Sequence, residues 1–144
     1  MKNAHLFSSG TSTSYVDITS LILRIFGGGF MLYGHGLGKF QNFFSDQAIA
    51  FIDPFGISAT ATLGLVVFAE FICAALVMLG LMTRYALVPL VLTMLYAAFI
   101  AHGGDPFGKK EMALLYLVIF MALLLLGPGK YSLDRMIRKR RATV

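Results

Sequence analysis

Ionisable residues interrupt the apolar stretches of this 144-residue chain at positions where they could do chemistry. Arg24, His35 and Lys39 fall in the first apolar stretch, and Glu70 falls in the second. At about 100° per residue, a helix brings His35 within about 20° of Arg24 and places Lys39 one turn beyond His35. Because charges inside apolar spans are costly and often functional, this spacing predicts one polar stripe along the first helix.

Glu70 stands midway between Ala59 and Met82, the ends of its apolar stretch. An unpaired carboxylate at the centre of a bilayer is costly, so Glu70 must be protonated, paired with the stripe, or solvated by a cavity. A proton carrier needs such a group. A buried ion pair that fixes the register of two helices would use it equally well. The sequence leaves both interpretations open.

Two further ionisable residues are predicted at the depth of His35 and Lys39, near the outer face of the membrane. His102 follows the third apolar stretch, and Glu111 begins the fourth. Such a cluster could bind a polar headgroup or a quinone ring, with His or Lys as donor and a carboxylate as proton acceptor. The predicted cofactor-binding residues are Arg24, His35, Lys39, Glu70, His102 and Glu111, with Glu70 and His35 as the predicted catalytic residues.

The sequence gives less support for other cofactors, such as haem, a metal ion or a redox-active cysteine pair. His35 and His102 could ligate a b-type haem, but no haem signature accompanies them. The chain has no metal-ligand spacing such as His-Glu-x-x-His, so we assign no metal ligand. Cys73 is the single cysteine and has no resolving partner, so we interpret it as a packing residue. The sequence leaves the cofactor unidentified, and a quinone is the candidate that we consider first.

The stretches that carry these residues are long enough to cross a bilayer. The chain is 58% hydrophobic and 13% charged, which excludes an ordinary soluble domain. About 20 helical residues cross a hydrocarbon core of about 30 Å, and the alternation typical of barrel strands is missing. We predict an all-α, polytopic membrane protein, a bundle of four transmembrane helices at about residues 18–40, 59–82, 85–101 and 112–126.

Polar segments flank the predicted transmembrane domain of residues 18–127. Residues 1–17 form a polar leader, and residues 128–144 form a basic tail. Lys and Arg gather in this tail and at Arg84, so the positive-inside rule predicts that both termini are cytoplasmic. The net charge of +5 then faces anionic headgroups, and we expect no nucleic-acid partner. A short amphipathic helix beginning near Leu133 is predicted to touch lipid.

Several short motifs, taken in their order and spacing, resemble the DoxX family of small bacterial and archaeal membrane proteins. The similarity extends from Leu23 to Met136. The motifs are Leu23-Arg24, His35-Gly36-x-x-Lys39, Ala69-Glu70, Leu79-Gly80-Leu81, Thr83-Arg84, His102 and the ending Gly127-Pro128-Gly129-Lys130-Tyr131-Ser132-Leu133-Asp134-Arg135. The chain departs from many members at Glu70-Phe71-Ile72-Cys73, where they carry glycines after the glutamate.

The resemblance implies a four-helix protein of the bacterial inner membrane that serves a quinone-linked redox system. Family members are associated with a terminal quinol oxidase, with thiosulfate oxidation and with defence against oxidative stress. This chain has no dinucleotide loop, cysteine pair or flavin motif, so we expect an oxidoreductase subunit that does not act alone.

Two alternatives use the same buried charges. The first is a non-enzymatic accessory or scaffold subunit, whose polar residues join its own helices and whose surface docks a larger membrane-protein complex. The second is a small transporter or a proton-conducting homo-oligomer. In each case the lipid bilayer is a partner of the chain.

Overall fold

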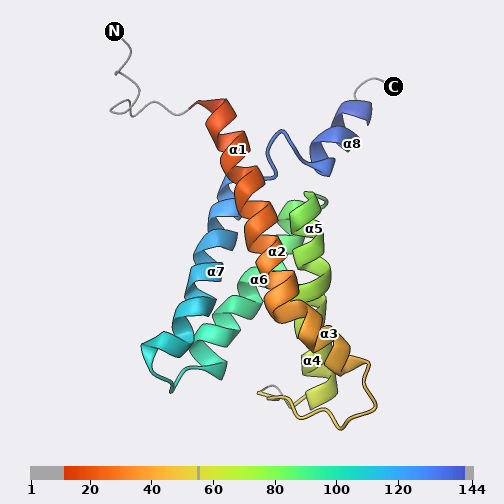
Figure 1. Ribbon diagram of the computed structural model, residues 1–144, viewed down its shortest axis with the longest axis vertical. Helices are drawn as coiled ribbons and strands as arrows, with labels where there is room; N and C mark the ends of the chain where they lie inside the picture. Colours follow the sequence, from red (N-terminus) through yellow and green to blue (C-terminus); the bar gives the residue numbers. More distant parts are fainter. Residues whose placement is uncertain (1–11, 55, 142–144) are drawn as a thin grey trace.

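The computed structural model describes residues 12–54 and 56–141, and this part of the chain is all-helical, without strands (Figure 1). The predicted all-α class is therefore confirmed. Most of the predicted leader, residues 1–11, and the last three tail residues, 142–144, lie outside the described residues.

The first long helical segment runs continuously from Thr13 to Phe43. It begins earlier than the predicted residue 18, because the Ser12 hydroxyl caps it by accepting a hydrogen bond from the Ser14 N–H at 3.2 Å. Its parts alternate between α-helix and π-helix: α1 (Thr13–Leu23), η1 (Arg24–Gly28), α2 (Gly29–Met31), η2 (Leu32–Gly36) and α3 (Leu37–Phe43).

The remaining helices follow the apolar stretches of the sequence. The second segment joins α4 (Ala59–Val67), η3 (Phe68–Cys73) and α5 (Ala74–Leu79), and the third joins α6 (Thr83–Tyr96) and η4 (Ala97–Ala101). The chain ends with α7 (Phe107–Leu126) and the short α8 (Leu133–Arg141).

Three helical segments of the described chain are long and apolar enough to cross a membrane: residues 13–43, 59–79 and 83–101. They contain most of the first three predicted spans. The fourth predicted span, 112–126, lies within α7, which has 20 residues. Charged residues in the first turns of α7 shorten its apolar part: Lys109, Lys110 and Glu111.

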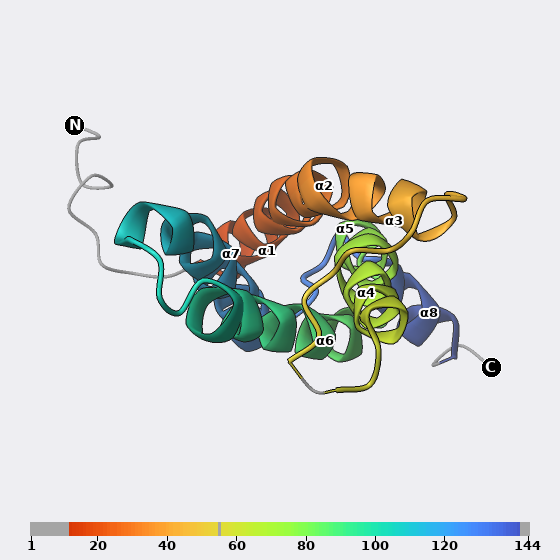
Figure 2. The same ribbon diagram turned by 90° about the horizontal axis from the view of Figure 1, so that it is seen from below.

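The long segments pack as a ring, which Figure 2 shows in end view. The first segment contacts the second segment and α7, and the third segment also contacts both of these. The interior is filled by buried side chains from these segments, among them Met31, Leu87, Leu90, Phe120 and Leu123. Large apolar side chains cover the outside, as expected where lipid is the solvent, among them Phe30, Leu65, Leu92, Val118 and Leu125.

Two glycines let the first segment approach the second at backbone distance. A Cβ added at Gly28 would lie 2.9 Å from the Ala74 carbonyl oxygen, and one added at Gly36 would overlap the carbonyl of Glu70. Because no side chain separates the helices at these positions, side chains on either flank of the crossing can reach one another.

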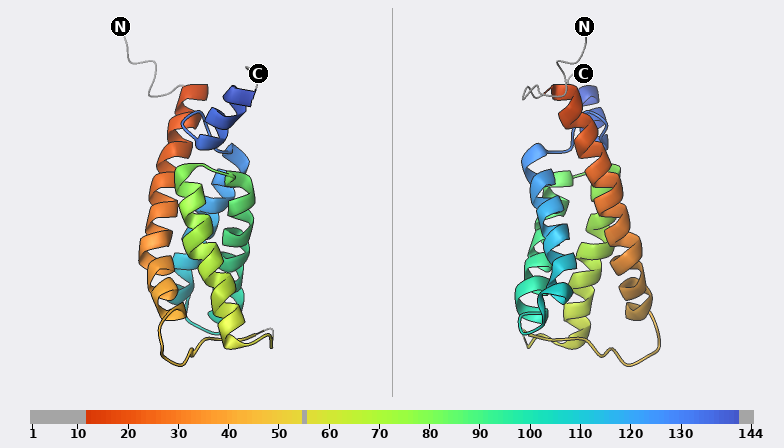
Figure 3. Two further views of the ribbon diagram at one scale, coloured as in Figure 1. Left: turned by 90° about the vertical axis from the view of Figure 1, so that its right-hand side faces the viewer. Right: turned by 60° about the vertical axis from the view of Figure 1, so that its left-hand side comes forward.

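The two ends of the bundle differ in structure (Figure 3). One end, which we name the loop end, carries the connections of residues 44–58 and 102–106. The other, the tail end, carries the start of α1 and the whole of α8. Gly127, with a φ of 78°, ends α7 as predicted, and the tail then crosses this end of the bundle.

Candidate functional site

An ion pair between the first and second segments forms the centre of the candidate site. Lys39 Nζ lies 2.5 Å from Glu70 Oε2. The Glu70 side chain is only 4% exposed, whereas that of Lys39 is 31% exposed. The pair therefore joins a carboxylate shielded by the bundle to a lysine side chain that is partly exposed.

Local packing explains why these two residues meet. Gly36 contacts the backbone of Glu70 directly and lies about one turn before Lys39. Because side chains on a helix lean toward its N-terminus, the Lys39 side chain can reach back to Glu70. On the following residues, the rings of Phe40 and Phe71 stack with centroids 4.4 Å apart and an interplanar angle of 21°. The ion pair thus has an aromatic stack beside it.

His35 lies beside this pair, on η2, and is half-buried. Its ring meets the ring of Tyr116 edge-on, with centroids 5.5 Å apart and an interplanar angle of 88°. Tyr116 comes from α7 and is buried. The structure therefore gathers His35, Lys39, Glu70 and Tyr116 from three helical segments into one region.

His102 belongs to a separate network at the loop end. Its Nδ1 lies 2.9 Å from Asp105 Oδ2, and Lys109 Nζ lies 3.7 Å from the other oxygen of that carboxylate. The hydrogen bond with His102 lowers the pKa of Asp105, and the Lys109 charge adds to this effect against the opposing desolvation. In the described part of the chain, no hydrogen bond joins His102 to Lys39 or Glu70.

Glu111 is exposed, in the first turns of α7. It forms no hydrogen bond with the Lys39–Glu70 pair within residues 12–54 and 56–141. The structure thus brings Lys39 and Glu70 into contact, places His35 nearby, and leaves Glu111 on the surface.

Arg24 lies at the tail end of the first segment, away from the ion pair of Lys39 and Glu70. Its side chain is buried, at 1% exposure, and its Nη2 donates to the Tyr131 carbonyl oxygen at 2.8 Å. Along the helix it is roughly 20 Å from Lys39. The stretches η1 and η2 contain Arg24 and His35, and π-helical i→i+5 bonding invalidates the angular spacing of an α-helix.

The predicted buried cluster is consequently smaller than expected. Among the described residues, the charged side chains that are buried are Arg24 and Glu70, and they serve different ends of the molecule. In the same part of the chain, no group of three or more His, Cys, Asp or Glu gathers in a way that could hold a metal ion.

Two residues of this site, Tyr116 and Phe71, were not predicted from the sequence. Tyr116 sits among apolar residues of α7, and nothing near it in the sequence marks it as a partner of His35. Phe71 did leave a signal, because it belongs to the stretch Glu70-Phe71-Ile72-Cys73, where the chain departs from the pattern that the DoxX resemblance implies. That departure from the family pattern marks the residue that stacks beside the ion pair.

Comparisons with known proteins agree with this architecture. The DoxX family profile matches residues 19–103. An uncharacterized membrane protein of Mycobacterium tuberculosis is 31% identical over 121 residues, which are 73% of this chain and 66% of that protein. The chain therefore spans slightly less than two thirds of that relative. An uncharacterized protein of Haemophilus influenzae is 29% identical over 129 residues, or 85% of each chain.

No solved structure matches the chain significantly. The family profile covers more than half of the chain, and its match includes His35, Lys39, Glu70 and His102. This chain belongs to the DoxX family of membrane proteins.

Proposed function

We propose that this chain is the membrane-embedded subunit of a quinone-linked redox system and that Lys39 and Glu70 bind the polar ring of a quinone or similar amphiphile. The observation that supports this most is the geometry of the ion pair. A partly exposed lysine side chain is held against a shielded carboxylate, beside an aromatic stack. Ionisable residues inside membrane spans are rare and often mark sites where ligands or protons pass.

The residues present fit a quinone ring. The Lys39 ammonium would donate a hydrogen bond to a ring oxygen, and the Glu70 carboxylate would accept a proton from a ring hydroxyl. Phe40 and Phe71 provide aromatic surface beside the pair. A bound quinone supplies the electron-transfer chemistry, while the chain binds it, orients it and holds a proton at the Glu70 carboxylate.

The proposal includes an orientation in the bacterial inner membrane. We take α7 as the fourth span, since it packs along α6 and α1. The tail end then faces the cytoplasm, because its cations outnumber those of the loop end: Arg84, Lys130, Arg135, Arg138, Lys139 and Arg140. Cations at the loop end are accompanied by acids, as Lys109 is by Asp105.

Titration of the purified protein with a water-soluble quinone analogue tests the site. We expect thermal stabilisation of the wild type, and about tenfold weaker binding by Glu70→Gln, since a charged hydrogen-bond acceptor is lost. The control is Glu111→Gln, which removes an exposed carboxylate from α7. Equal binding by the wild type and Glu70→Gln, or no binding by a folded wild type, would contradict the proposal.

A second candidate function is that of an accessory subunit, and one observation favours it. Lys39 and Glu70 satisfy each other at the helix crossing of Gly36, as a structural pair would. The exchange Lys39→Glu with Glu70→Lys separates the two functions. If the pair is purely structural, the exchanged pair should recover the stability and the assembly that each single substitution loses. A quinone site predicts restored stability with quinone binding still lost, because acid and donor have changed places.

A further inference from the structure

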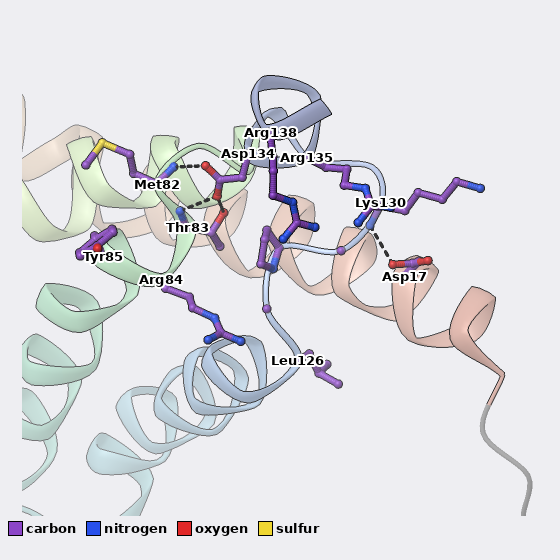
Figure 4. Close-up of a pocket in the computed structure, with 13 residues that line it drawn as sticks. Asp17, Met82, Thr83, Arg84, Tyr85, Leu126, Lys130, Asp134, Arg135 and Arg138 are labelled. Carbon is purple, nitrogen blue, oxygen red and sulfur yellow. Dashed lines mark hydrogen bonds between the residues drawn. The ribbon is translucent and has the colours of Figure 1, made fainter. Parts of the chain in front are cut away.

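We propose that a groove at the tail end binds the phosphate of an anionic phospholipid. The groove has a volume of about 680 Å³ and lies between the start of α6, the end of α7, the connecting turn and α8 (Figure 4). Its lining includes four cationic side chains: Arg84, Lys130, Arg135 and Arg138. This site is at the opposite end from Lys39 and Glu70 and does not depend on the quinone proposal.

The arginines approach the groove from different elements. Figure 4 shows Arg138 reaching from α8 toward the turn that follows Leu126, with Arg84 beside the end of α7. Within residues 12–54 and 56–141, the guanidinium groups of Arg84, Arg135 and Arg138 form no hydrogen bond or ion pair. A planar guanidinium with five donors matches the oxygens of a phosphate group.

The two acidic residues of the groove are already engaged by other groups. Asp134 accepts hydrogen bonds from the Met82 N–H at 2.7 Å, from the Thr83 N–H at 3.0 Å and from the Thr83 hydroxyl at 2.8 Å. Asp17 accepts one from the Lys130 N–H at 2.8 Å. These carboxylates hold the tail in place and leave the arginines for an anion from outside.

Arg24 adds a buried positive charge beneath the tail. Its Nε and Nη1 have no hydrogen-bond acceptor among the described residues, and Nη2 binds the Tyr131 carbonyl oxygen. Ser20 also fixes the tail by donating to the Gly127 carbonyl oxygen at 2.7 Å. Lys130, Arg135 and Arg138 therefore lie on a tail segment that is bonded to α1 and to the start of α6, and Arg84 lies on α6 itself. Little conformational freedom is then lost when a ligand binds.

The apolar side chains of the same groove favour a lipid over a free phosphate ion. Met82, Tyr85 and Leu126 line it and are exposed. They adjoin the apolar surfaces of α6 and α7, where acyl chains would lie once the phosphate reached the arginines. Basic pockets between membrane helices commonly hold anionic headgroups in this way.

Native mass spectrometry of the full-length protein in detergent tests the groove. The probes are phosphatidylglycerol and phosphatidylcholine, applied to the wild type, Arg84→Gln and Arg138→Gln. We expect the wild type to prefer phosphatidylglycerol and each substitution to weaken its binding about fivefold. The control is Lys139→Gln, which removes one charge from α8 at a residue that does not line the groove. Circular dichroism and the thermal midpoint confirm that each variant is folded.

Each outcome of this experiment decides the proposal. Equal retention of the two lipids by the wild type overturns it, and so does an equal loss in Lys139→Gln, which would indicate diffuse attraction by the tail. Inorganic phosphate is the second arm. Displacement of the lipid only by a large excess of phosphate supports a lipid site. If phosphate binds the groove as tightly as the lipid does, the phospholipid assignment is overturned and a free anion is the ligand.

Discussion

At the scale of single residues, burial decides which partner of the ion pair matters more to stability. Glu70 is shielded from solvent, whereas Lys39 is partly exposed. A charge left unpaired in the interior costs several times more than one that can turn to water. The two residues of one interaction should therefore respond differently to removal.

We predict that Lys39→Met destabilises the protein more than Glu70→Gln does. Lys39→Met leaves a shielded carboxylate without its cation, at a cost of about 3 kcal/mol. Glu70→Gln keeps a polar side chain and leaves an ammonium that can reach solvent, at about 1 kcal/mol. Thermal unfolding in one detergent measures the order, and the double variant should recover part of the loss. A lower thermal midpoint for Glu70→Gln than for Lys39→Met would show that the burial argument is wrong.

Individual residues also show which features of the site can be predicted from the sequence. Lys39 and Glu70 were recognisable because charges stand out in apolar stretches, and their contact was among the interpretations left open. Arg24 was recognised for the same reason, but its bonding partner was not predicted. Its partner is the Tyr131 carbonyl, more than a hundred positions away, and no local pattern encodes that contact.

At the scale of elements, the helices were predictable and their fine structure was not. The apolar stretches located the three described spans closely, since each must be helical in a bilayer. The π-helical stretches η1, η2 and η3 had no recognisable signal, yet they contain Arg24, His35 and Glu70. The helix crossing at Gly36 depends on which glycine faces the second segment, and that is decided by packing.

We predict that Gly36→Ala separates the first two helical segments and weakens the ion pair. The new Cβ would overlap the Glu70 carbonyl, and overpacking of this kind costs about 1–3 kcal/mol. Gly34→Ala and Gly38→Ala are matched controls, because a Cβ at either position meets nothing within 4 Å. Thermal midpoints of the three variants provide the measurement. The interpretation fails if Gly36→Ala unfolds at the same temperature as both controls.

The start of α4 should respond to acid through Asp53. Desolvation raises the pKa of this carboxyl, but hydrogen bonds from the N–H groups of Ser58 and Ile57 and the Thr62 hydroxyl together hold it below its usual 3.8. Because the pKa of Asp53 is lower in the folded than in the unfolded protein, its ionised carboxylate stabilises the fold at any pH above the unfolded-state pKa. This stabilisation is lost as the pH falls through the lower pKa of the folded state.

The predicted result is a gap in thermal midpoint between the wild type and Asp53→Ala that is constant from about pH 7 to 5 and narrows below about pH 4. Asp46→Ala, at an exposed position in the same connection, is the control. A gap that widens on acidification would contradict the assigned hydrogen bonds.

At the scale of the whole molecule, charge is distributed unevenly between the two ends. Most cations of the tail end lie on a tail that is bonded to the bundle, while the loop end mixes cations and acids. By the positive-inside rule, this distribution favours the proposed orientation, in which the tail end faces the cytoplasm. The sequence predicted the distribution, but the attachment of the tail to α1 and to the start of α6 became visible only in three dimensions.

Labelling of single cysteines tests that orientation. In a Cys73→Ala background, Gln47→Cys reports on the loop end and Lys139→Cys on the tail end. A membrane-impermeant maleimide added to intact spheroplasts should label the first, and it should label the second only after permeabilisation. Labelling of Lys139→Cys in intact spheroplasts would invert the orientation.

The most direct test of the central claim is identification of the small molecules that remain bound when the protein is purified in mild detergent. Mass spectrometry of the wild type should detect a quinone in an amount comparable to the protein. Glu70→Gln, folded by its thermal midpoint, should have lost that quinone, while Glu111→Gln should retain it. Bulk phospholipid alone in all three preparations would contradict the quinone site and leave the Lys39–Glu70 pair as a structural link between two helices.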